Sequence, residues 1–134
     1  MQLKHANLVT PDVAASAEFF HRFFGFEIMD KRGANALAVM RDPNDFVLTL
    51  MKSKKGDPDR YPQTFHLGFY FDSPDLVKAK HAELQAAGLS PGKVETTNRG
   101  GEVSTFYCVC PGGITVEVCT APGFVKQPAP ATAG

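Results

Sequence analysis

The chain has 134 residues, 43% of them hydrophobic, which is enough for one compact domain with a substantial core. Its 14 Lys and Arg residues balance its 14 Asp and Glu residues and neither sign forms a long block, so the charge pattern argues against nucleic acid or an anionic membrane as a partner. No run approaches the roughly 20 apolar residues of a membrane span, and the first residues lack the features of a signal peptide, so we expect a cytoplasmic protein.

The first half of the chain has the pattern of a strand, a helix and three further strands. Residues 1–9 form the expected strand. Thr10 is expected to cap the helix with Pro11 at its first position, and Gly25 is expected to end it. Apolar residues recur at helical spacing before this glycine, so the helix must pack against a sheet. The following strands are expected at about 26–32, 35–41 and 45–52.

After a polar loop the same order begins again. A strand is expected over residues 64–72, and Ser73 and Pro74 then start a second helix that ends at Gly88. Three more strands are expected at about 91–96, 102–110 and 113–120.

The spacing of the two halves indicates an internal repeat. Thr10 to Gly25 and Ser73 to Gly88 each span fifteen positions. We therefore predict an α+β fold of two paired βαβββ modules, whose sheets can curve around a common cleft. We expect a single domain over residues 1–121, made of modules at about 1–53 and 64–121. A flexible tail is expected over residues 122–134.

Strand parity separates three polar side chains from the core. Phe65, Leu67, Phe69 and Phe71 alternate with His66, because successive strand residues point to opposite faces. His5 and Glu117 stand opposite the apolar positions of their own strands in the same way. Two imidazoles and a carboxylate can hold one side of a divalent ion and leave positions open for substrate.

Each of these residues also has an ordinary explanation. A single strand histidine is more often a hydrogen-bonded or partly exposed side chain than a ligand, and Glu117 could simply lie on an open sheet face. The positions of the histidines favour the joint interpretation. His5 lies five residues before Thr10 and His66 lies seven before Ser73, so both keep the same strand parity in equivalent parts of the repeat.

The sequence resembles the vicinal oxygen chelate superfamily, which includes glyoxalase, bleomycin resistance proteins, extradiol dioxygenases and fosfomycin resistance thiol transferases. The resemblance covers essentially residues 2–120. It rests on the paired module pattern and on the motifs "HANLVTPD" with "FFGF", "FHLGFYF" and "FYCVCPGGITVEV".

The resemblance implies metal ligands at His5, His66 and Glu117. The extra carboxylate of glyoxalases falls at Thr49, which argues against a standard glyoxalase and agrees with a site of two histidines and one carboxylate. Tyr107 matches a substrate-contacting tyrosine of the fosfomycin enzymes, so we take it as a catalytic or pocket residue and as a candidate base.

Other polar and sulfur-containing residues have weaker signals. Arg99 lies near a substrate-contacting loop of the fosfomycin enzymes, one residue out of step. Where the family's turn has an aspartate this chain has Cys110, and we interpret this cysteine, with Cys108 and Cys119, as a small hydrophobic strand residue. The histidines within the helices are expected at the surface or boundary, at His21 and His81.

The implied function is a metal-dependent enzyme that chelates an oxygen-bearing small molecule on Zn, Mn, Fe, Ni or Co. Lyase, thiol transferase and dioxygenase chemistry all remain open. A metal-independent binding protein of the bleomycin resistance type is the alternative, and a regulatory module with a vestigial site is a third possibility. The family also implies a homodimer, in some members with exchanged halves.

Overall fold

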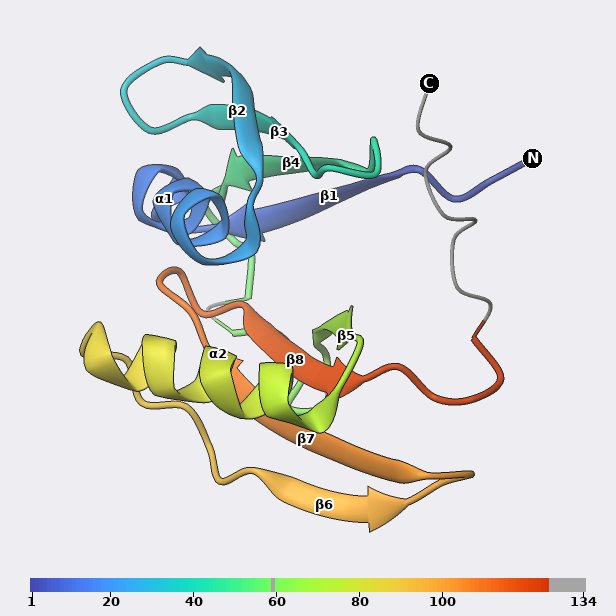
Figure 1. Cartoon of the computed structure of the whole chain (residues 1–134). Helices are drawn as coiled ribbons and strands as arrows, with labels where there is room; N and C mark the ends of the chain where they lie inside the picture. The colour runs from blue at the N-terminus through green and yellow to red at the C-terminus, as the bar shows by residue number, and fades with distance from the viewer. Residues whose placement is uncertain (59, 126–134) are drawn as a thin grey trace. The chain divides into compact units, whose positions relative to one another are not determined.

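The computed structural model describes residues 1–58 and 60–125, and the predicted flexible tail lies outside this part from residue 126 onward (Figure 1). The chain forms two compact units. The first contains Met1–Leu67 together with Val109–Val116, and the second contains Gly68–Cys108 together with the residues from Glu117 on. In the described residues we find no helix with the length and apolar character that crossing a membrane requires.

The first module has the predicted order of strand, helix and three strands. Its sheet has the order β1-β4-β3-β2, in which β1 runs parallel to β4 and the other neighbours are antiparallel. A parallel pair needs a long crossover connection, which here contains α1 and the two intervening strands. The elements are β1 (His5–Thr10), α1 (Val13–Phe24), β2 (Glu27–Arg32), β3 (Leu37–Arg41) and β4 (Val47–Lys52).

The second module repeats this design with the strand order β5-β8-β7-β6. The elements are β5 (Leu67–Phe71), α2 (Pro74–Ala86), β6 (Glu95–Asn98), β7 (Glu102–Val109) and β8 (Thr115–Thr120). The fold is therefore α+β with two βαβββ modules, as predicted.

Three strands begin three or more residues later than predicted, and the first of them is β1, which begins at His5 and not at residue 1. β5 begins at Leu67 because the Phe65 amide donates to the Pro62 carbonyl in a turn, at 2.9 Å, and so does not join the ladder. β6 begins at Glu95 rather than near residue 91. Pro91 has no amide hydrogen to donate, which disfavours a strand start at that point.

The core of the first module lies between α1 and one face of its sheet. Phe19 and Phe20 of the helix are buried and meet edge to face, at 5.4 Å between ring centroids. On the sheet, Met40, Leu48 and Leu50 are fully buried. The contacts of α1 with β3 and β4 join these two sets, so the apolar stripe packs as the sequence predicted.

The second helix is anchored differently. Its buried residues are only Val77 and Leu84, whereas α1 buries six. His81 packs edge-on against Phe106 of β7, with 5.0 Å between ring centroids, and its Nε2 lies 2.9 Å from the Gly92 carbonyl oxygen. His81 is half-buried and His21 is exposed, which confirms their expected boundary and surface positions.

The prediction of Thr10 as the first helix cap is wrong. Asp12 is the N-cap, because its Oδ1 accepts the Ala15 amide at 3.0 Å. Thr10 is fully buried at the end of β1, and its Oγ1 lies 2.9 Å from Ser16 Oγ. The predicted cap at Ser73 is confirmed, since its hydroxyl accepts the Leu76 amide at 3.3 Å.

This correction aligns the two histidines with their helix caps, but it removes the equal helix spans, because Asp12 to Gly25 is thirteen positions and Ser73 to Gly88 is fifteen. His5 lies seven residues before the cap Asp12, and His66 lies seven residues before the cap Ser73. The two histidines therefore occupy equivalent positions, without the offset of two that the Thr10 assignment required.

Candidate functional site

His5 lies at the start of β1, opposite Val47 of β4, on the exposed face of the first sheet. Its Nε2 is 3.2 Å from Thr49 Oγ1, and the Thr49 hydroxyl donates to Asn7 Oδ1 at 2.6 Å. Because that hydroxyl has only one proton, His5 Nε2 must donate to Thr49. In the neutral imidazole the lone pair is then on Nδ1.

His66 is held through its other ring nitrogen, Nδ1. Its Nδ1 is 2.9 Å from the Thr64 carbonyl oxygen. A carbonyl can only accept, so Nδ1 carries the hydrogen, and the lone pair of the neutral ring is on Nε2. Metal-binding histidines are commonly oriented by this kind of bond from the second ring nitrogen to a carbonyl.

Tyr107 and Glu117, predicted separately, form one hydrogen-bonded pair in the second unit. The Tyr107 phenol donates to the Glu117 carboxylate, and this bond is the main reason that the pKa of Tyr107 is raised to about 12. Partial burial and the negative charge of Glu117 act in the same direction, and the charge of Arg99 acts against them. Arg99 thus lies within electrostatic range of this pair.

Strand register supports the equivalence of the two modules. In the first, the Ser53 amide donates to the Thr10 carbonyl at 3.0 Å, and in this ladder Asn7 stands beside Thr49. In the second, the Ala121 amide donates to the Phe71 carbonyl at 2.9 Å. The same register places Gly68 beside Glu117, as the counterparts of Asn7 and Thr49.

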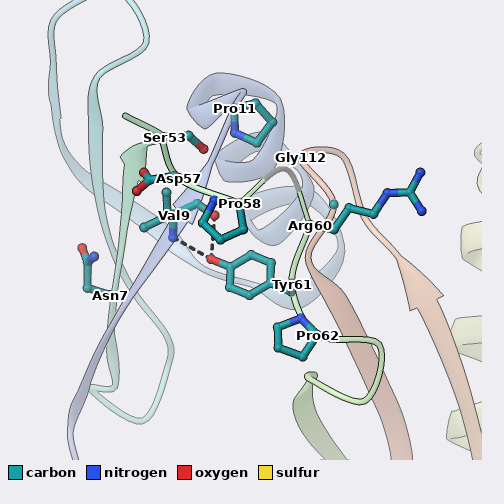
Figure 2. Close-up of a pocket in the computed structure, with 11 residues that line it drawn as sticks. Asn7, Val9, Pro11, Ser53, Asp57, Pro58, Arg60, Tyr61, Pro62 and Gly112 are labelled. Carbon is teal, nitrogen blue, oxygen red and sulfur yellow. Dashed lines mark hydrogen bonds between the residues drawn. The ribbon is translucent and has the colours of Figure 1, made fainter. Parts of the chain in front are cut away.

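The first unit also contains a cavity that sequence reasoning did not anticipate (Figure 2). It has a volume of about 300 Å³, at the lower end of the range typical of small-molecule sites. Its lining comes from β1, the loop after β4 and the turn before β8: Asn7, Val9, Pro11, Ser53, Asp57, Pro58, Arg60, Tyr61, Pro62, Gly112 and Gly113.

Tyr61 fixes one wall of this cavity. Its hydroxyl accepts the Val9 amide at 2.7 Å and donates to the Val9 carbonyl at 2.6 Å, so it pairs both backbone groups of an edge-strand residue (Figure 2). Burial is the main reason that the pKa of Tyr61 is raised. An aromatic residue beside proline in an otherwise charged loop was the signal that could have identified this residue.

Comparison with known proteins agrees with the fold of two βαβββ modules. The family model of the Glyoxalase/Bleomycin resistance protein/Dioxygenase superfamily matches residues 2–118. The chain belongs to this superfamily. A search of curated proteins gives no match.

Several solved structures share the superfamily fold. A possible glyoxalase from Bacillus cereus is 42% identical, with 88% of this chain and 97% of that chain covered and a TM-score of 0.73. Lactoylglutathione lyase from Agrobacterium tumefaciens is 19% identical, with coverage of 90% and 93% and a TM-score of 0.71. The fosfomycin resistance protein FosX from Listeria monocytogenes is 16% identical, with coverage of 87% and 89% and a TM-score of 0.71.

The three predicted ligands of this superfamily member are divided between the compact units. His5 and His66 lie in the first unit and Glu117 lies in the second. Within residues 1–58 and 60–125, no group of three or more His, Cys, Asp or Glu side chains is positioned to hold a metal ion. The metal site of His5, His66 and Glu117 therefore stays a prediction.

The cysteines fit their expected structural role. All three are buried thiols in the reduced form, and Cys110 donates from Sγ to the Ile114 carbonyl at 2.7 Å. The Cys110 amide bonds the same carbonyl at 2.8 Å, so this residue closes the turn before β8. Burial also raises the pKa of Cys108, which keeps that thiol protonated and unreactive.

Proposed function

We propose that the protein is a metal-dependent enzyme whose His5, His66 and Glu117 bind a divalent ion that chelates an oxygen-bearing small molecule. The observation that carries this proposal is the equivalence of the two histidines. Each precedes its helix cap by seven residues, each lies on the exposed side of its chain segment, and each has one ring nitrogen held by a hydrogen bond.

The donor set fits such an ion. Neutral imidazole nitrogens and a carboxylate suit divalent transition metals, and three protein ligands leave coordination positions for substrate. His66 presents Nε2 as a ligand without any change of tautomer. His5 donates from Nε2 to Thr49, so it binds a metal through Nδ1 or after its ring turns over.

When bound, the ion would act as a Lewis acid that stabilises negative charge developing on a substrate oxygen. Tyr107 orients the Glu117 carboxylate through its hydrogen bond. In the metal-free protein this bond raises the pKa of Tyr107 to about 12, so Tyr107 keeps its proton at neutral pH and acts as a hydrogen-bond donor. Arg99 adds positive charge within electrostatic range of Tyr107 and thereby favours anionic substrate groups.

The relatives are consistent with this chemistry. The more similar solved structure is described as a possible glyoxalase, and more distant ones include a lactoylglutathione lyase and a fosfomycin resistance protein. We further propose that the two modules make up one domain over residues 1–121 and that the protein acts as a homodimer.

Metal analysis of untagged protein tests the assignment. We expect about one divalent ion per chain in the wild type, and loss of it in His5→Ala, His66→Ala and Glu117→Gln, because three-ligand sites rarely keep affinity with two ligands. His81→Ala is the matched control, since this histidine bonds Gly92 and packs on Phe106. Its metal content should equal that of the wild type.

A second candidate function has its own supporting observation. The cavity beside Tyr61 is lined by three prolines, two glycines, Val9 and Tyr61 together with four polar residues, and no histidine is among its lining residues, so it can hold a ligand without any metal. A metal-independent binding protein of the bleomycin resistance type would use such a site. Wild-type protein that binds small molecules but takes up no stoichiometric metal would favour this function and contradict the first.

A further inference from the structure

Gly68 is the second residue of β5, and the local structure does not require a glycine at this position. Glycine within a strand is less favourable than alanine by about 0.5–1 kcal/mol because its chain is freer when unfolded. Its usual justifications are a positive φ or a crowded neighbourhood. The φ angle of Gly68 is not positive, and a Cβ at this position would meet no heavy atom within 4 Å.

The open space over Gly68 lies beside Glu117. Strand register places the two residues as neighbours, and paired residues of adjacent strands project to the same face of a sheet. In the first module, the equivalent position holds Asn7, whose side chain bonds the counterpart of Glu117. The second module lacks any side chain there, so the Glu117 carboxylate borders an unfilled space.

Two exposed tyrosines lie on the same face. Tyr70 is two residues from Gly68 along β5 and has the same parity, and Tyr107 bonds Glu117 from β7. Their residue exposures are 55% and 47%, which is high for large aromatic side chains. Tyrosine rings attract flat ligands by stacking or edge-on contact with the ring, and each also offers a hydroxyl.

We infer that Gly68 is a specificity-determining residue, which leaves room beside Glu117 for a planar aromatic ring that carries an oxygen donor and contacts Tyr70 and Tyr107. The inference rests on the proposed function, because the ligand oxygen would point toward the ion that Glu117 helps to bind. It extends that function by naming aromatic alcohols and related ring compounds as the substrate class.

The test compares two bicyclic alcohols of similar size, flat 2-naphthol and puckered decahydro-2-naphthol, by ligand-observed NMR titration. Both are neutral, so the charge of Glu117 does not separate them, and the saturated compound is at least as apolar. We expect the wild type to bind 2-naphthol about fivefold more tightly, with or without metal, because only the flat ring can stack on tyrosine.

Substitutions at Gly68 then locate the ring. Gly68→Leu should weaken 2-naphthol binding at least tenfold because its side chain fills the space. Gly68→Ala should weaken 2-naphthol binding less than Gly68→Leu does. It should also unfold at a higher temperature than the wild type, and that result would show that the fold does not need the glycine. Thr97→Leu is the matched control, since it adds leucine to an exposed position of β6 in the same sheet.

The outcomes separate the two proposals. Equal binding of 2-naphthol by Gly68→Leu and the wild type, or binding of the saturated alcohol as tight as that of 2-naphthol, would overturn the inference about Gly68. Absence of metal from the wild type, with the preference for the flat ring intact, would overturn only the proposed metal-dependent function.

Discussion

At the residue scale, the pair of Tyr107 and Glu117 shows what strand parity can and cannot predict. Parity correctly assigned Glu117 to the face opposite Val116 and Val118, both of which are buried. Parity also placed His5 and His66 opposite the apolar faces of their strands, and both residues are exposed. It could not predict the bond between Tyr107 and Glu117, because that bond depends on which residues face each other across two strands.

This pair gives a titration that can be measured on metal-free protein. The pKa of Tyr107 is raised above the ordinary value of 10.0 to about 12, so the folded state binds this proton more tightly than the unfolded state. The stabilising contribution is present below pH 10 and is lost as the pH rises through 12. In Glu117→Gln, we expect the pKa of Tyr107 to fall toward 10, because the charged acceptor is gone.

Ultraviolet absorbance of the tyrosinate form measures this change. The chain contains three tyrosines, so Tyr107→Phe identifies which titration step belongs to residue 107. If Glu117→Gln left that step at its wild-type pH, Glu117 would not be the group that raises the pKa.

At the element scale, the turn before β8 is fixed against the start of α1. The Pro111 carbonyl lies 2.7 Å from Ser16 Oγ, and Ser16 and Thr10 are fully buried. A Cβ on Gly112, which has φ of 90°, would collide with Thr10 Oγ1 and Ser16 Oγ. The neighbouring Gly113 has φ of 83°, but a Cβ there would meet nothing within 4 Å.

Substituting each of these two glycines measures how much the close packing of Gly112 against Thr10 and Ser16 affects the free energy of unfolding. Gly112→Ala should lower the free energy of unfolding by about 3–5 kcal/mol, from backbone strain combined with overpacking. Gly113→Ala should lower it by about 1–2 kcal/mol, from strain alone. Urea unfolding measures both values, and equal losses in the two variants would show that the collision with Thr10 and Ser16 is relieved at little cost.

The same segment explains the wrong helix cap. The sequence "TPD" contains two residues able to cap, and sequence alone favoured Thr10 because Pro11 suits the first helical position. In the structure, the Thr10 hydroxyl is already engaged, since it accepts the Asp12 amide at 3.2 Å and lies near Ser16. The capping role passes to Asp12 because these contacts hold the Thr10 hydroxyl at the buried end of β1, an arrangement that sequence does not reveal.

At the scale of the whole molecule, the repeat was the most informative sequence feature. Helix stops at Gly25 and Gly88 and the alternation along the strands gave the number, order and type of elements correctly, because both depend on local conformation and burial. The cavity beside Tyr61 was missed because it depends on a loop that meets β1 through two hydrogen bonds. Loop positions of this kind have no periodic signature in sequence.

Metal binding to the proposed site predicts a change in the stability of the whole protein. An ion bound only by the folded state stabilises it by about 2.7 kcal/mol at a free concentration of 100 times its Kd. We expect calorimetry to show a rise in Tm when the chosen metal is added and a return to the starting value with a chelator. His66→Ala should lose this response, whereas His81→Ala should keep it although its starting Tm is lower, because His81 packs on Phe106.

The metal response is more informative than either Tm alone, because each variant serves as its own reference. A packing defect lowers the Tm equally with and without metal, whereas loss of a ligand removes the difference between the two. Since the stabilisation grows with the logarithm of metal concentration, the wild-type Tm should also keep rising above saturation of the site. A Tm that stays constant across that range, or a response that His66→Ala retains, would mean that the ion binds elsewhere or not specifically to the folded state.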